Sequence, residues 1–154
     1  MSAGMGEADF LEALKSKLGD RILRASVMGP RRVAITVKPG DHRIAIEALK
    51  EFGGSHVSTI TGTDMGENIE IAYHVWCYQA RIEASIKAEV PKSSPSIETI
   101  SDLIPGSMLY EAEARDLLGI EFKGLPYEGK LILPEDWPEG VHPLRKDWKP
   151  DWRK

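Results

Sequence analysis

The stretch Ile82-Glu83-Ala84-Ser85-Ile86-Lys87-Ala88-Glu89-Val90 alternates apolar and polar side chains along its whole length. Successive side chains of a β-strand point to opposite faces of a sheet, so this pattern predicts a strand with one buried face and one exposed face. The segment just before it has the same period of two, with apolar side chains at Ile69, Ile71, Tyr73 and Val75. These two neighbouring strands indicate a sheet that is covered on one side.

The chain upstream of these strands predicts the rest of the sheet and two helices. Residues 21–28, 32–38 and 57–61 are expected to be strands, the first two joined as a hairpin by a turn at Gly29-Pro30-Arg31. Apolar residues at helical spacing predict helices over residues 9–18 and 41–52. The two helices are expected to cover the sheet.

Downstream, a serine and a proline at positions 94 and 95 favour a helix start, which predicts a short helix over residues 94–103. A second, charged helix is expected from Ser107 to Gly119. Beyond residue 124 five prolines by position 150 leave room only for turns. The fold class is therefore α+β: a mostly antiparallel mixed sheet of about five strands with covering helices in a domain of residues 1–123, and an extended C-terminal docking arm, 124–154.

Composition excludes several classes of function. The chain has 154 residues, 42% of them hydrophobic, and a formal net charge of -4, which argues against nucleic-acid binding. No apolar run approaches the roughly 18 residues that would suggest a membrane span. The segment Met1–Glu7 lacks the basic and apolar regions of a signal peptide, so we expect the chain to stay on the cytoplasmic side.

The sequence gives no support for a catalytic, cofactor or metal site. The single cysteine, Cys77, cannot form an internal disulfide or hold a cluster or zinc ion by itself. Glu111 and Glu113 are two residues apart, so on a helix they diverge by about 200° and cannot share a proton or a metal. The four histidines are scattered, and no serine lies in a nucleophile elbow.

Two dense motifs, Glu111–Ile120 and His142–Trp148, are the candidates for recognition. Spacing alone predicts a modest surface ion pair between Glu111 and Arg115. The region from 137 onward contains three of the four tryptophans, and large aromatic residues beside arginine are typical of interface anchors. Composition leaves open whether the arm docks on a partner or folds back over its own sheet. The predicted partner-docking residues are Glu111, Glu113, Arg115, Asp116, Trp137, His142, Pro143, Arg145, Lys146, Asp147 and Trp148.

Several of these motifs together resemble a known family. The run from Glu111 to Phe122 resembles the signature of the C subunit of respiratory complex I (NADH dehydrogenase) and of its relatives in archaeal membrane-bound NiFe hydrogenase-type complexes. Further matching segments are Thr63-Asp64, Pro95-Ser96-Ile97, Gly124-Leu125-Pro126, Leu131–Trp137 and His142–Asp147. The family has an arginine and a histidine where this chain has Ala112 and Leu125, and these departures favour the hydrogenase-like branch.

The resemblance implies a non-catalytic subunit in the hydrophilic arm of a membrane-associated, ion-translocating redox complex. The chain would buttress the large hydrogenase-like subunit, lie near the small subunit that bears iron–sulfur clusters, and meet the membrane arm only indirectly. It would bind no cofactor; iron–sulfur clusters, and NiFe in hydrogenases, would belong to partner subunits. Its expected location is peripheral, on the cytoplasmic side of the cell membrane. The alternatives are the C subunit of an NADH- or F420H2:quinone-type complex I, an enzyme in its own right, or a free-standing binding module.

Overall fold

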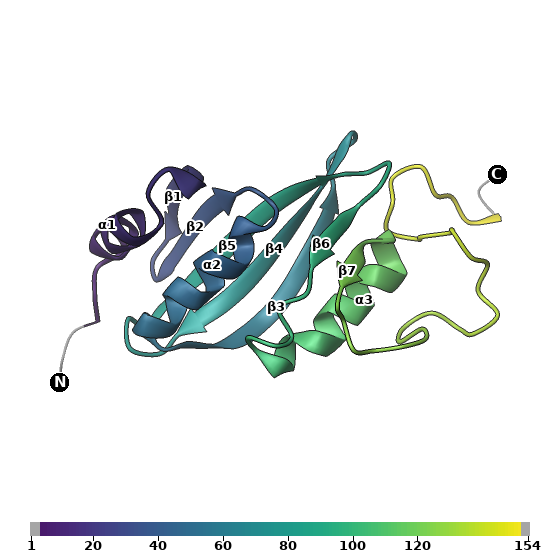
Figure 1. Ribbon diagram of the computed structural model, residues 1–154. Helices are drawn as coiled ribbons and strands as arrows, with labels where there is room; N and C mark the ends of the chain where they lie inside the picture. Colours follow the sequence, from purple (N-terminus) through teal and green to yellow (C-terminus); the bar gives the residue numbers. More distant parts are fainter. Residues whose placement is uncertain (1–3, 152–154) are drawn as a thin grey trace.

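A computed structural model describes residues 4–151 of the chain (Figure 1). Met1–Ala3 of the amino-terminal segment and Trp152 of the predicted arm lie outside the described residues. The helices and strands are α1 (Glu7–Leu18), β1 (Ile22–Gly29), β2 (Arg32–Val37), α2 (Asp41–Leu49), β3 (Gly54–Asp64), β4 (Asn68–Cys77), β5 (Ile82–Pro91), β6 (Ser96–Glu98), α3 (Met108–Leu118) and β7 (Glu121–Lys123).

Five strands form one mixed sheet in the order β1-β2-β5-β4-β3. All neighbours pair antiparallel except β2 and β5, which run parallel. The connection between these two parallel strands contains α2, β3 and β4, so they meet only after the chain has built the other side of the sheet. The predicted fold class, the hairpin of the first two strands and the order of the upstream helices are confirmed.

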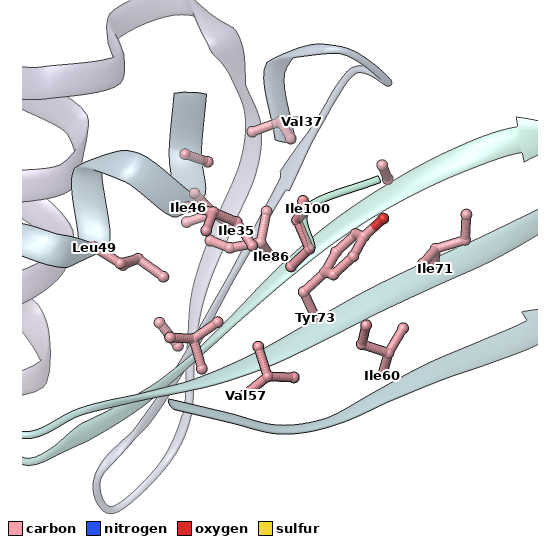
Figure 2. Packing of buried hydrophobic residues seen from close by; sticks show 14 of the residues in the cluster. Ile35, Val37, Ile46, Leu49, Val57, Ile60, Ile71, Tyr73, Ile86 and Ile100 are labelled. Atoms are coloured by element: carbon pink, nitrogen blue, oxygen red, sulfur yellow. The ribbon is translucent and has the colours of Figure 1, made fainter. Parts of the chain in front are cut away.

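The buried face of the sheet carries the core. The apolar residues of β4 and β5 that alternate in the sequence are at most 1% exposed, while Glu70 and Lys87 on the opposite face are partly exposed. Helix α1 contributes Phe10 and Leu14, and α2 contributes Ile46 and others, to the same hydrophobic cluster. Figure 2 shows Tyr73 of β4 among the aliphatic side chains of this cluster. The predicted division into one buried and one exposed face is confirmed.

The helix predicted over residues 94–103 is wrong. Ser96–Glu98 form β6, which pairs in parallel with β7, and the carbonyl of Pro95 accepts a hydrogen bond from the N–H of Glu121 at 2.9 Å. The local helix-start signal is overridden because these backbone groups find partners in a strand that lies beyond α3. The resulting two-stranded sheet lies beside α3 in Figure 1.

Two side chains of α2, His42 and Arg43, hold β6 and the residues that follow it in place. The ring of His42 is fully buried; its Nδ1 accepts the N–H of Gly40 at 3.0 Å, so its Nε2 carries the proton and donates to the carbonyl of Glu98 at 2.9 Å. Burial lowers the pKa of His42, which favours the neutral ring. Arg43 donates to the carbonyl of Thr99 and makes two 2.7 Å bonds to the carboxylate of Asp102.

Helix α3 packs against β3 through a close backbone approach. Leu118 is buried, and a Cβ atom at Gly62 of β3 would overlap its side chain. Glycine at this position therefore lets the helix lie directly on the strand. Among the described residues, none of the helices is long and apolar enough to cross a membrane.

Candidate partner-docking site

The two glutamates of the first motif lie on different sides of α3. Glu111 is fully buried, whereas Glu113 is exposed. Their separation follows from the 100° turn that each residue adds along a helix. The expectation that these two carboxylates cannot share a proton or a metal is consistent with this geometry.

The Glu111–Arg115 surface ion pair predicted from spacing is wrong: both residues lie in the described part of the chain and form no ion pair. Glu111 instead accepts hydrogen bonds from the hydroxyl of Thr99 at 2.6 Å and the N–H of Ile100 at 3.3 Å, and Ser107 Oγ lies 3.4 Å away. Burial raises the pKa of Glu111 to about 7, and these hydrogen bonds oppose the rise.

Arg115 and Asp116 fasten the first half of the arm to α3. The guanidinium of Arg115 donates to the carbonyls of Tyr127, at 2.7 Å, and Gly129. One carboxylate oxygen of Asp116 accepts the N–H groups of three consecutive residues, Leu131–Leu133, at 2.8, 2.8 and 3.3 Å. Because three donors converge on one buried carboxylate, this segment is curved tightly around the end of Asp116.

The second motif binds the carboxyl end of α3. The last carbonyls of a helix have no partner within it and carry a partial negative charge. Here three donors of the arm bind these carbonyls. His142 Nδ1 donates to the carbonyl of Asp116 at 3.0 Å, and the N–H of Leu144 donates to the carbonyl of Leu117 at 3.0 Å. Arg145 Nε donates to the carbonyl of Leu118 at 2.8 Å. The arm thus gives partners to the last carbonyls of α3, in addition to the C-cap at Gly119, whose N–H binds the carbonyl of Arg115.

Gly119 makes this cap possible, and its replacement by alanine should loosen the arm. Its φ of 76° is in the left-handed region, and a Cβ atom there would lie 2.5 Å from the ring of His142. Gly129 has a similar φ of 80° and no atom within 4 Å of such a Cβ. Both alanine variants therefore lose about 1 kcal/mol to backbone strain, but only Gly119→Ala also displaces His142.

We expect Gly119→Ala to be more destabilising than Gly129→Ala by about 1 to 2 kcal/mol in urea unfolding, the usual cost of forcing extra volume into a packed contact. Amide hydrogen exchange of residues 142–146 should rise in the Gly119 variant only. Equal losses in the two variants would show that contact between Gly119 and His142 contributes nothing beyond backbone strain.

A third anchor ties the second motif to the turn between β3 and β4. The buried carboxylate of Asp64 accepts the N–H of Lys146 at 2.9 Å and forms a 2.7 Å ion pair with Lys92, which also lies 3.2 Å from the carboxylate of Asp147. The Lys92 ammonium, then the N–H groups of Lys146 and Gly66, hold the pKa of Asp64 well below its usual range. Sequence reasoning missed Asp64 and Lys92 as anchors, although Thr63-Asp64 was one of the matching segments.

Two tryptophans of the arm, Trp137 and Trp148, are partly exposed and pack on each other. Trp137 and Trp148 pack at 6.1 Å between ring centroids, and Trp137 Nε1 donates to the carbonyl of Val141 at 2.8 Å. With Pro138 and Lys149 they line a hollow. No residue from 123 to 151 is buried, so the arm adds a surface layer and no core of its own. Figure 1 shows the arm looping out on the far side of α3 from the main sheet.

The predicted docking residues therefore divide into two groups. Those whose bonding groups are used within the chain are Glu111, Arg115, Asp116, His142 and Arg145. Those that leave side-chain surface available to a partner are Glu113, Trp137, Pro143, Lys146, Asp147 and Trp148. Of these, Asp147 is also paired with Lys92, and Trp137 Nε1 is bonded to Val141. Among the described residues, no group of three or more histidine, cysteine or acidic side chains could hold a metal ion.

Residues 35–154 match the family described as the respiratory-chain NADH dehydrogenase, 30 Kd subunit. The chain belongs to this family. It is 27% identical over 148 residues to the membrane-bound hydrogenase subunit beta of Pyrococcus furiosus, covering 90% of this chain and 86% of that protein. It is 30% identical over 148 residues to the C subunit of the F(420)H(2) dehydrogenase of Methanosarcina mazei, covering 94% and 93%. The resemblance found in the motifs is thereby confirmed.

Two solved structures have the same fold as this chain. A chain of the membrane-bound sulfane sulfur reductase, an archaeal respiratory membrane complex, matches with a TM-score of 0.83 at 22% identity, covering 95% of this chain and 87% of that chain. A trypsin-resistant fragment of Nqo5 matches with a TM-score of 0.65 at 20% identity, over 79% of this chain and 98% of that chain.

The two departures from the family signature are accommodated by packing. Ala112 is fully buried, and Leu125 is partly buried against the hydrophobic cluster. A long cationic side chain at position 112 would need space that this helix surface does not leave.

Proposed function

We propose that this chain is a non-catalytic subunit in the hydrophilic arm of a membrane-associated, ion-translocating redox complex, where it buttresses the large hydrogenase-like subunit. Family membership and the names of the two relatives support assembly into such a complex. The chain would bind peripherally, on the cytoplasmic side, and the iron–sulfur clusters and any NiFe centre would lie in its partners.

The observation that carries this proposal is the shape of the arm. The arm is held by hydrogen bonds to α3 and to Asp64, while the rings of Trp137 and Trp148 stay partly exposed and line a hollow. A segment whose backbone is fixed before binding loses little conformational entropy on association, which favours tight docking. Aromatic pairs that line a hollow are the usual anchors of protein interfaces.

Which member of the superfamily this chain serves is a second question. The match to the F(420)H(2) dehydrogenase protein, at slightly higher identity than the match to the hydrogenase protein, favours a quinone-type complex I as the alternative. In either case, electrons from ferredoxin, NADH or reduced coenzyme F420 would pass through neighbouring chains. The proposed mechanical role of this chain is the same.

Replacing Trp137 and Trp148 together by alanine is expected to release the chain from its complex. Loss of two interface anchors should weaken association at least about thirtyfold, whereas removal of two partly exposed rings outside the hydrophobic cluster leaves the core intact. The measurement is the amount of this chain that co-purifies with a tagged large subunit on a sizing column, beside the thermal melting of the isolated variant.

Ile44→Ala provides the control, because Ile44 is 41% exposed on α2, away from the arm. It should leave co-purification unchanged. If the double tryptophan variant instead lost folding stability and assembly in equal measure, the tryptophan pair would act within the chain and the docking role would be overturned. Arg145→Ala is a poorer probe, since Arg145 already caps α3.

A further inference from the structure

The end of the main sheet opposite the arm carries a second cluster of recognition residues. Two turns meet there, one between β1 and β2 and one between β4 and β5, and the carbonyl of Arg31 in the first accepts the N–H of Glu83 at 2.9 Å. Strand β4 extends over ten residues from the turn that binds the arm to this end, about 30 Å at the rise of a strand. The separation is visible in Figure 1.

Two arginines and two large aromatic residues surround a hollow at this end: Arg31, Trp76, Tyr78 and Arg81. Tyr78 is 58% exposed, and its ring meets that of Trp76 edge-on at 6.4 Å between centroids. The ring of His56 lies 6.5 Å from that of Tyr78. Tryptophan, tyrosine and arginine are the residue types most enriched at the energetic centres of protein interfaces.

Both arginines keep charge available to a partner. Within residues 4–151, neither Arg31 nor Arg81 forms an ion pair with a carboxylate. Arg31 donates through Nη1 to the carbonyl of Met5 at 3.3 Å, and the nearby carboxylate of Glu7 binds its backbone N–H at 2.8 Å, which offsets part of its charge. Within residues 4–151 no ion pair with a carboxylate offsets the charge of Arg81. The side chain is thus a local positive charge in a chain whose net charge is -4.

We propose that this hollow binds an acidic segment of a partner chain in the complex, with carboxylates on Arg81 and Arg31 and apolar stems against Trp76 and Tyr78. The inference rests on the proposed function in that it requires a complex. Guanidinium groups recognise carboxylates through paired hydrogen bonds, and aromatic rings supply contact area at small entropic cost. With the arm docked at one end and this hollow at the other, the chain bridges two separate surfaces of the complex.

The proposal is tested by placing a photo-crosslinking amino acid at position 78 in the assembled, affinity-purified complex. The crosslinked peptide, mapped by mass spectrometry, should come from a partner chain and contain at least two aspartates or glutamates near the crosslink. The same amino acid placed at Ile44 serves as the control for non-specific capture. Arg81→Asn should lower the yield at position 78 about tenfold, because it removes the free charge.

Asparagine is the substitution of choice because Arg81 has a φ of 56°, and asparagine adopts the left-handed region readily, so the turn should keep its shape. A charge exchange completes the test: Arg81→Glu should abolish crosslinking, and lysine in place of the mapped acidic residue should restore it. The proposal would be overturned if the crosslinked peptide contained no acidic residue, or if no partner chain were crosslinked. It would also be overturned if position 78 crosslinked instead to a single-stranded oligonucleotide added as a competitor.

The outcome is separable from that of the proposed function. If the chain never co-purifies with a complex, the proposed function fails. If it co-purifies through the arm, and the yield at position 78 is unaffected by Arg81→Asn, only the present proposal fails. Lys50→Glu, an exposed charge reversal on the short turn after α2, should change neither result.

Discussion

The free energy of unfolding of the native chain should fall as the pH rises from about 4.5 to about 7, and Glu111→Gln should remove most of this fall. Burial raises the pKa of Glu111 to about 7 in the folded chain, from an ordinary value of 4.5. At low pH the carboxyl is protonated in both the folded and the unfolded chain, and its contribution to stability is fully present. As the pH rises above 4.5 the unfolded chain ionises first, so the folded state is progressively disfavoured.

The loss is complete once the folded chain ionises as well, near pH 7. Each unit of pKa difference corresponds to about 1.4 kcal/mol, so the free energy of unfolding should fall by about 3 kcal/mol across this window. Glutamine does not titrate, and it can reproduce the hydrogen bonds of the protonated acid. Its oxygen would accept the N–H of Ile100, and its amide N–H would donate to the hydroxyl of Thr99. The Thr99 hydroxyl would then donate to Ser101 Oγ, which lies 2.9 Å away.

Urea unfolding at pH 4.5 and pH 8 measures the effect directly. The difference in unfolding free energy between Glu111→Gln and the native chain should grow by about 3 kcal/mol from the lower to the higher pH. Glu113→Gln, on the exposed side of the same helix, should follow the native chain. Parallel curves for Glu111→Gln and the native chain would mean that the pKa of Glu111 is the same in the folded and the unfolded chain, with its hydrogen bonds offsetting burial.

The main sheet could be predicted from sequence because its signal is local. A period of two along β4 and β5 reports a buried face wherever the partner strand lies, and the apolar spacing of α1 does the same for a helix. β6 could not be predicted in this way, since its three residues are extended only because β7 pairs with them after an intervening helix. Ser94 and Pro95 carry a real helix-start signal, which tertiary pairing overrides.

The candidate site was harder to predict for two physical reasons. The spacing of Glu111 and Arg115 is equally compatible with a solvated and a buried face of α3, so it could not show that the carboxyl points into the core. The arm is held mainly through backbone groups, such as the carbonyls of Leu117 and Leu118, and these have no signature in the sequence. Gly119 after a helix was the one local signal of a cap.

Asp116→Ala should detach residues 131–133, in the first half of the arm, from α3, the largest local change expected from a single substitution in this chain. Asp116 is 6% exposed, and its carboxylate is the acceptor for the N–H groups of Leu131–Leu133. Hydrogen bonds to a charged group contribute about 1.5 to 3 kcal/mol each, although three that share one oxygen contribute less than their sum. We therefore expect amide exchange at residues 131–133 to speed up by at least about a hundredfold, equivalent to about 3 kcal/mol.

Two comparisons decide what this loss means for function. Asp116→Asn keeps one carbonyl oxygen in place, so it should retain part of the protection that alanine removes, and Glu113→Ala on the exposed side of α3 should change nothing. If the arm must be preformed to dock, Asp116→Ala should also lower co-purification with the large subunit. The melting of the sheet domain should change little, because the side-chain hydrogen bonds of Asp116 go to the arm and, within residues 4–151, to no strand of the main sheet. Full assembly with a detached segment 131–133 would show that the partner, and not α3, gives the arm its bound shape.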